Sequence, residues 1–114
     1  MSINNNVRLL GNVVADPEVN YNPKGIVVAT ICLATTEFWK DKKTDEWKEE
    51  NTWHTIICWG EMAKAIERRV KKGTSMTIEG RLANDSWQDN DGKKNYKVFI
   101  KIEQYHIHGG EKDR

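Results

Sequence analysis

Residues 51–60 read N-T-W-H-T-I-I-C-W-G, and this stretch decides how the rest of the chain can fold. In a β-strand, successive side chains point to opposite faces, so Ile56 and Cys58 fall on one face and Trp53 and Trp59 on the other. Ile56 and Cys58 are compact enough for the interior of a small barrel, whereas two indoles are too bulky. The tryptophans therefore need a partner subunit, a neighbouring loop or a flat ligand to cover them.

Length and composition describe one small domain. The 114 residues suffice for one hydrophobic core but not for two. With 18 Lys and Arg against 17 Asp and Glu, the net charge is +1, and no strong overall field attracts nucleic acid or an acidic membrane. Cys32 and Cys58 lie in strand-like runs without metal-type spacing, which predicts free thiols in a reducing cytosol. No run is long and apolar enough to span a bilayer, so no membrane partner is expected.

Alternating apolar residues predict five strands, at residues 7–14, 26–36, 51–59, 75–82 and 96–102. Proline, glycine and asparagine punctuate residues 15–25, which we predict as a loop. Residues 37–50 are charged and lack a helical apolar stripe, which favours an extended hairpin arm that turns near Thr44 and Asp45.

One segment, residues 61–72, has the pattern of a helix. Its apolar face comprises Met62, Ala63, Ile66 and Val70, and Gly73 follows as the expected C-terminal glycine. Four cations lie where the helix dipole favours positive charge, which is their predicted role: Arg68, Arg69, Lys71 and Lys72.

The order of these elements predicts the fold class. One helix between the third and fourth of five strands is the order of the OB-fold, an all-β, five-stranded Greek-key barrel. An immunoglobulin-type sandwich would need about seven strands and no central helix. We expect this domain to cover residues 1–108, with a short polar tail at residues 109–114.

Catalytic chemistry has little support in the sequence. There is no G-x-S-x-G turn around a nucleophile and no glycine-rich phosphate loop that opens a helix. His106 and His108 would share one face of a strand and could bind a metal, but neither a cysteine nor a third ligand lies nearby. We therefore expect no enzyme, no metal and no cofactor, and the two histidines alone support the alternative of a metalloprotein.

Aromatic residues next to lysines are the clearest functional pattern. Proteins that bind single-stranded nucleic acid stack bases on flat side chains, at roughly 1–3 kcal/mol each, and contact the phosphates with cations. Trp39 precedes three lysines, and Trp87 ends an arm close to two more. Stacking is indifferent to base identity, so we expect little sequence preference. Trp47 shares an arm with Trp39, but we assign it a structural role in bracing the hairpin.

Four segments resemble the bacterial single-stranded DNA-binding protein family, SSB. They are L-L-G-N-V-V-A-D-P-E-V (9–19), L-A-T-T-E-F-W-K-D-K (33–42), W-H-T-I-I-C-W-G (53–60) and K-K-G-T-S-M-T-I-E-G-R-L (71–82). The segments occur in the family order, and the resemblance extends over residues 7–102. It implies an OB-fold subunit, commonly in a homotetramer, that binds and protects single-stranded DNA in replication, recombination and repair. It also implies a protein without catalytic activity, in the cytoplasm and associated with the nucleoid.

The resemblance also implies the site residues. The family's stacking positions fall on Trp39, Trp53, Trp59 and Trp87, and its basic positions are kept at Lys40, Lys42, Lys43 and Lys72. At the position of Trp59 the family usually has phenylalanine, which also offers a stacking surface. His54 falls on a position of subunit contact in the family; the alternative is a histidine whose hydrogen bonds are satisfied inside the monomer.

Several positions depart from the family pattern. Acidic residues replace frequent cations at Glu61 and Asp85, and neutral residues do so at Asn6, Asn20, Thr55 and Ser86. Fewer phosphate contacts predict a shallow salt dependence of binding. The family's flexible tail with its acidic tip is missing after G-G-E-K-D-R, so we expect no recruitment of replication proteins by that route, whether the chain is truncated or naturally short. These losses keep open a second hypothesis, a protein–protein adaptor on the same fold.

Overall fold

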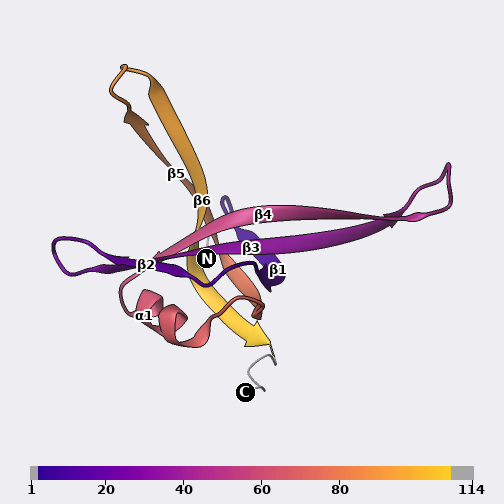
Figure 1. The fold of residues 1–114 in the computed structure, drawn as a ribbon, viewed down its shortest axis with the longest axis horizontal. Helices are drawn as coiled ribbons and strands as arrows, with labels where there is room; N and C mark the ends of the chain where they lie inside the picture. The colour runs from indigo at the N-terminus through magenta and orange to yellow at the C-terminus, as the bar shows by residue number, and fades with distance from the viewer. Residues whose placement is uncertain (1–2, 109–114) are drawn as a thin grey trace.

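The computed structural model describes residues 3–108, which form six strands and one helix: β1 (Val7–Val13), β2 (Glu18–Tyr21), β3 (Val27–Lys40), β4 (Trp47–Trp59), α1 (Gly60–Arg69), β5 (Ser75–Gln88) and β6 (Lys94–His108). Figure 1 shows this arrangement. Over this range no helix has the length and apolar character needed to cross a membrane. The predicted polar tail at 109–114 lies outside the described residues.

Five of the six strands close into a barrel. The strands are ordered β1-β5-β6-β4-β3, and β3 returns to β1 through the pairs Asn12–Ala34 and Val13–Leu33. All neighbours are antiparallel except β4 and β6, which run parallel. The helix lies between the third and fourth barrel strands in chain order, so the predicted OB-fold is confirmed.

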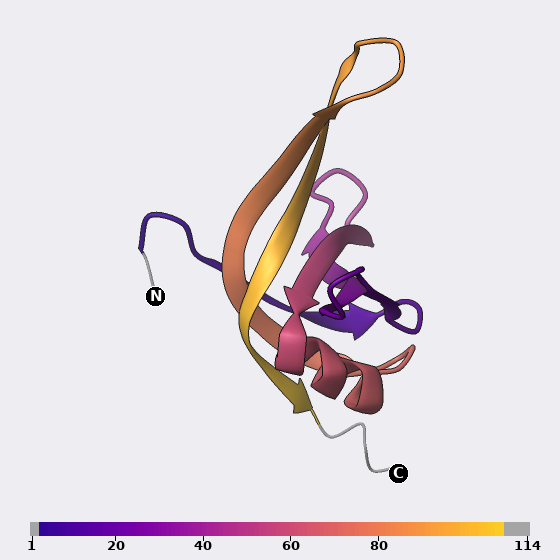
Figure 2. The ribbon, with the colours of Figure 1, turned by 90° about the vertical axis from the view of Figure 1, so that its left-hand side faces the viewer.

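Alternate side chains of the strands fill the barrel interior. Ile56 and Cys58 are buried there, as predicted, together with β-branched and aliphatic residues of β3 and β5. The apolar face of α1 adds Ala63 and Ile66 and closes the barrel at the end opposite the hairpin arms (Figure 2). Because the helix is amphipathic, burial of this one face in the common core is what holds it in place.

Two glycines allow strands to approach closely. A Cβ at Gly11 would overlap the carbonyl oxygen of Ala34, at the point where β1 leaves β5 for β3. A Cβ at Gly80 would overlap the carbonyl oxygen of Lys101, at the β-bulge between β5 and β6. Such bulges bend strands and help a sheet to close into a barrel.

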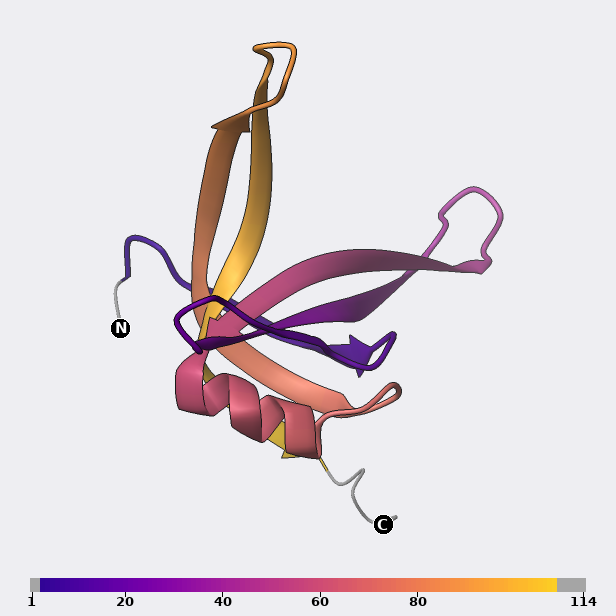
Figure 3. The same ribbon diagram turned by 60° about the vertical axis from the view of Figure 1, so that its left-hand side comes forward.

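Two long hairpins extend beyond the barrel as arms (Figure 3). The β3–β4 arm confirms the predicted hairpin, and its turn contains Asp45 with a left-handed φ of 62°. In the turn of the β5–β6 arm, the Asp89 carboxylate accepts hydrogen bonds from the backbone N–H groups of Lys93 and Asp91, which lower its pKa. Strand β5 runs past its predicted end at residue 82 because its pairing with β6 continues along the polar arm, and β6 runs past residue 102 because it pairs with residues 75–79 of β5 in the barrel.

Two local predictions were wrong. Residues 18–21 are not loop but strand β2, which pairs with β3 from Glu18–Thr30 to Tyr21–Val27. The strand is only four residues long, and nearby prolines hide it in the sequence. The helix ends at Arg69 rather than residue 72, because Val70 is already extended and turns its side chain into the core. Gly73, with φ +93°, therefore belongs to the following turn and not to the helix terminus.

Candidate nucleic-acid interface

The strand registers define an inner and an outer side of the sheet. Ile56 pairs with Ile100 on the inner side, so the neighbouring pair Ile57–Lys101 belongs to the outer side. Two-residue alternation then places Trp53 and Trp59 on the outer side of β4, as the sequence predicts. The same alternation along the β5–β6 arm places Trp87 on this side, through its pair with Asn95. Three of the four predicted stacking residues therefore share one side of the sheet.

Trp53 is the most accessible of these three side chains. The residue is 68% exposed although it lies in a barrel strand that pairs on both sides. Its pair across the β3–β4 ladder is Ala34, whose small side chain leaves the indole uncovered. An uncovered indole on a rigid strand is suited to stack against a flat ligand.

Trp59 lies in a more structured environment than Trp53. Its ring contacts Phe99 edge to face, with centroids 6.3 Å apart, and Phe99 is itself 6% exposed. The ammonium of Lys101 lies over the indole at 5.3 Å from its centroid, a cation–π distance. Trp59 keeps 40% of its surface exposed, so the ring is held in place while part of it faces solvent.

Trp39 leaves its hairpin on the side opposite Trp53. Trp39 pairs with Lys48, and Trp53 pairs with Ala34. The two pairs are an odd number of residues apart along the β3–β4 ladder, so their side chains point to opposite faces of the hairpin. Trp47 lies on the same face of the hairpin as Trp53 and is 69% exposed, so little of its ring packs on the hairpin. The bracing role predicted for Trp47 finds no support, and this residue extends the accessible aromatic surface of the arm.

The predicted lysines occupy two regions of the molecule. Lys40, Lys42 and Lys43 lie at the tip of the β3–β4 arm, where Lys40 forms an ion pair of 3.2 Å with Asp45. Lys72 lies instead in the turn after α1, where its backbone N–H donates to the Asp16 carboxylate at 2.8 Å. The structure therefore groups three of the four with Trp39 and places Lys72 on neither arm.

His54 lies at the fork where the two arms diverge. With Trp53, Leu82, Val98 and three other residues it lines a groove of about 200 Å³. The residue is half-buried, and its Nε2 lies 2.9 Å from the hydroxyl oxygen of Thr35 on the neighbouring strand. This hydrogen bond agrees with the alternative of a histidine satisfied inside the monomer, while a subunit contact stays a prediction.

His106 and His108 lie together near the end of β6. Their ring centroids are 4.8 Å apart, and His108 Nε2 lies 2.6 Å from the Thr77 hydroxyl oxygen. Within residues 3–108 no three His, Cys, Asp or Glu side chains gather in a way that could hold a metal ion. His106 and His108 share one face of the strand, as predicted. Among the described residues, no third His, Cys, Asp or Glu side chain lies with them in a metal-binding arrangement.

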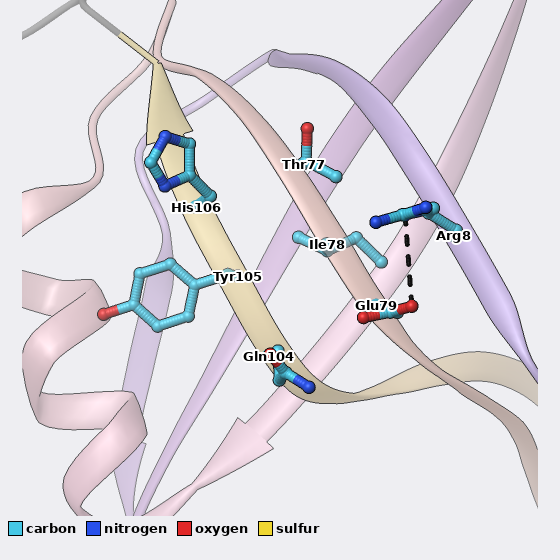
Figure 4. Close-up of a pocket in the computed structure, with 7 residues that line it drawn as sticks. All are labelled: Arg8, Thr77, Ile78, Glu79, Gln104, Tyr105 and His106. Atoms are coloured by element: carbon cyan, nitrogen blue, oxygen red, sulfur yellow. Dashed lines mark ion pairs between the residues drawn. The ribbon is translucent and has the colours of Figure 1, made fainter. Parts of the chain in front are cut away.

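Beside them is a shallow pocket of about 130 Å³ on β1, β5 and β6 (Figure 4). Arg8 and Glu79 form an ion pair across it at 3.9 Å, and Tyr105 extends toward α1, where its hydroxyl accepts a hydrogen bond from Arg69. The pocket contains none of the predicted stacking tryptophans. It belongs to a different part of the molecule from the aromatic outer side.

Sequence reasoning missed two aromatic and two cationic residues of the arms and outer side: Phe38, Phe99, Lys97 and Lys101. Phe38 is an exposed neighbour of Trp39. The other three alternate with the apolar residues of β6, so their common side could be read from the sequence. The proximity of Phe99 and Lys101 to Trp59 could not, because it depends on the parallel pairing of β4 with β6.

A closed OB barrel with solvent-exposed tryptophans and cations on its outer side defines the class of an oligonucleotide-binding protein. The profile of the Single-strand binding protein family matches residues 4–108, and the chain belongs to that family.

Two solved structures are similar over nearly the whole chain. One is the Plasmodium falciparum SSB in complex with single-stranded DNA, with a TM-score of 0.80, 28% identity, and coverage of 94% of this chain and 96% of that chain. The other is a deletion mutant of the single-stranded DNA-binding protein from Thermus aquaticus, with a TM-score of 0.80 and 26% identity. The match covers 93% of this chain and 51% of the Thermus chain, so this chain spans about half its length.

Proposed function

We propose that this protein binds single-stranded DNA without sequence preference, by stacking bases on Trp39, Trp53, Trp59 and Trp87 and by contacting the backbone through lysines. Membership of the single-strand binding protein family supports single-stranded DNA as the ligand. The similar Plasmodium protein was solved with single-stranded DNA bound. A family of binding proteins also supports a role without catalysis.

The observation that carries this function is the exposure of Trp53. Single exposed apolar side chains are common on proteins, but several exposed indoles on one side of a barrel mark a contact surface. Trp59 and Trp87 lie on the same side of the sheet. Indoles on one side of a rigid sheet offer successive stacking positions to a flexible strand, and duplex DNA cannot use them because its bases are already stacked.

Charge supports a binding mode in which stacking dominates. The net charge is +1, and Lys40 is paired with Asp45 at the tip of the β3–β4 arm. Each phosphate neutralised by a free cation contributes about 0.7 to the slope of log K against log salt for single strands. A net charge this close to zero implies a shallow slope, and a steep slope would show that lysine contacts carry more of the binding.

The same function implies a biological setting and an assembly. Protection of exposed single strands serves DNA replication, recombination and repair, in the cytoplasm with the nucleoid. We propose a homotetramer with His54 at a subunit contact. The groove beside His54 supports this assignment, because it leaves room for a partner's side chain next to the imidazole.

Intrinsic tryptophan fluorescence tests the function directly. Titration with oligo-dT should quench the emission strongly, and titration with oligo-dA should give a similar end point, whereas duplex DNA of the same length should have little effect. A salt series of the oligo-dT titration then measures the slope. If neither single strand quenches the emission, single-stranded DNA binding by stacking is excluded, and the aromatic surface becomes a partner surface, as an adaptor would need.

A further inference from the structure

The arrangement of Lys101 over Trp59 has a consequence for how a base can reach this ring. Lys101 comes from β6 and Trp59 from β4, and the parallel pair Ile57–Lys101 sets the two side chains on the same outer side. Phe99, two residues before Lys101 on β6, packs against the indole in a T-shaped arrangement and is buried. The ring is therefore supported by Phe99, while the half-buried Lys101 lies across its face.

Within the part of the chain that the structure describes, no carboxylate forms an ion pair with Lys101. Four ion pairs occur among residues 3–108: Arg8–Glu79, Lys40–Asp45, Lys48–Glu46 and Lys64–Glu61. Lys101 takes part in none of these four, and its ammonium lies 5.3 Å from the centroid of the Trp59 ring. A cation held against an aromatic face, rather than against an acid, keeps its charge available for a phosphate.

A nucleobase and an ammonium cannot occupy the same face of an indole. Base stacking on an exposed tryptophan is stronger than an exposed cation–π contact, so an incoming base displaces the lysine. The four-carbon stem of lysine is flexible, and its ammonium can move without a change in the backbone. The displaced ammonium is then free to contact a phosphate of the bound strand.

We propose that Lys101 is a phosphate-binding residue of the single-stranded DNA interface, which covers Trp59 in the free protein and moves to the DNA backbone when a base stacks on that ring. This inference rests on the proposed function. Lys101 would add a phosphate contact on the barrel itself, next to Trp59 and away from the lysines of the arms. The two tryptophans then differ in how they bind a base. At Trp59 the base replaces the lysine on the ring, whereas at Trp53 the ring is already exposed to solvent.

The test is the salt dependence of oligo-dT binding by Lys101→Met. Methionine keeps an unbranched side chain but removes the charge, so the slope of log K against log salt should become shallower by about 0.7. The affinities of variant and wild type should meet near 1 M salt and differ by about 8-fold at 0.05 M. This factor is the roughly 20-fold ratio of the two salt concentrations raised to the power of about 0.7. Lys101→Arg keeps the charge and should keep the wild-type slope.

Arg69→Met is the matched control, because the Arg69 guanidinium lies over the Tyr105 ring at 5.8 Å, at the end of α1 and on neither arm. Its slope should equal that of the wild type. Equal changes in both methionine variants would overturn the assignment, because the effect would then be that of net charge. An unchanged slope in Lys101→Met would overturn it as well, and if the wild type binds oligo-dT normally, the proposed function survives that result.

Nuclear magnetic resonance supplies the second readout, on the movement itself. In the free protein the side-chain protons of Lys101 should be shifted upfield by the ring current of Trp59, and Trp59→Ala should abolish that shift. On addition of oligo-dT to the wild type, the same protons should return toward ordinary lysine values. If the upfield shift persists in the complex, the lysine stays on the ring and the exchange does not occur.

Discussion

Trp39 and Trp53 leave the β3–β4 hairpin on opposite sides, because Trp39 pairs with Lys48 and Trp53 pairs with Ala34, in alternate sets of one antiparallel ladder. A single strand that stacks on both indoles therefore has to pass from one side of the arm to the other. The DNA strand would then turn around the arm. Contact with both tryptophans would require a longer oligonucleotide than contact with Trp53 alone.

The first prediction follows from this separation. Trp53→Ala should weaken binding of short and long oligo-dT alike, whereas Trp39→Ala should weaken only oligonucleotides long enough to pass around the arm. Each loss should be about 1–3 kcal/mol, the value of one base stacked on an aromatic ring. Fluorescence or calorimetric titration over a series of lengths measures it. If Trp39→Ala weakens the shortest bound oligonucleotide as much as Trp53→Ala does, the two rings act on one side.

The second prediction separates binding from folding on the outer side. Trp53→Ala should raise the Kd for oligo-dT roughly 5- to 150-fold and leave the melting temperature almost unchanged, because the side chain is largely exposed. Phe99→Ala should instead lower the free energy of unfolding by about 3–5 kcal/mol, as a buried aromatic does. Thermal melts and DNA titrations of both variants test it; equal damage to stability by both would make Trp53 a core residue.

The third prediction concerns the closure of the barrel. Gly11→Ala should destabilise the protein by about 3 kcal/mol or more, because the new Cβ would overlap the backbone carbonyl of Ala34, which cannot move aside. Gly92→Ala is the control: φ there is +79° but the space around it is open, so the cost should be about 1 kcal/mol. Denaturant unfolding of both variants decides whether close strand approach outweighs backbone conformation; the reverse order would refute it.

The fourth prediction tests the assembly. His54→Lys places a permanent charge beside the groove at the fork of the arms and should shift the protein toward smaller species in sedimentation velocity. Thr35→Val is the matched control, because it removes the hydrogen bond that the Thr35 hydroxyl shares with His54 without adding charge, and should leave the assembly intact. An unchanged sedimentation coefficient for His54→Lys would rule out His54 as a subunit contact.

The fifth prediction follows from the buried thiol of Cys58. Burial raises the pKa of this thiol from 9.0 to about 11. The folded protein therefore holds the proton more tightly than the unfolded chain, and this stabilisation is complete below pH 9 and is lost as the pH rises through about 11. The loss is on the order of 2 kcal/mol. Cys58→Ala should unfold more easily at pH 8 but show a flatter fall in stability above pH 9; an equally steep fall would assign it to other groups.

Local chemistry accounts for what the sequence predicted correctly. Strict alternation around Ile56 and Cys58 specified which side of β4 enters the barrel, because a shift by one residue would bury Trp53. The helical period between the third and fourth strands specified the position of α1, and with it the OB order. The outward position of Trp53 and Trp59 was predicted by the same alternation, since a small interior has no room for indoles.

The short strand β2 and the long outer parts of β5 and β6 could not be predicted in this way. Polar residues such as Asn84 and Asn95 form strand only because a partner strand satisfies their backbone groups. The end of α1 at Arg69 was equally non-local, because Val70 is extended with its side chain in the core. In these segments pairing and burial across the fold outweigh local propensity.

By itself, then, the sequence determined the barrel, its inward and outward faces and the aromatic character of the binding surface, since these depend on periods of two and 3.6 residues along the chain. Tertiary structure alone decided which side chains meet. Lys101 reaches Trp59 through the parallel pairing of β4 with β6, and Trp39 is separated from Trp53 by the ladder register. Register is a relation between distant segments, and no local pattern contains it.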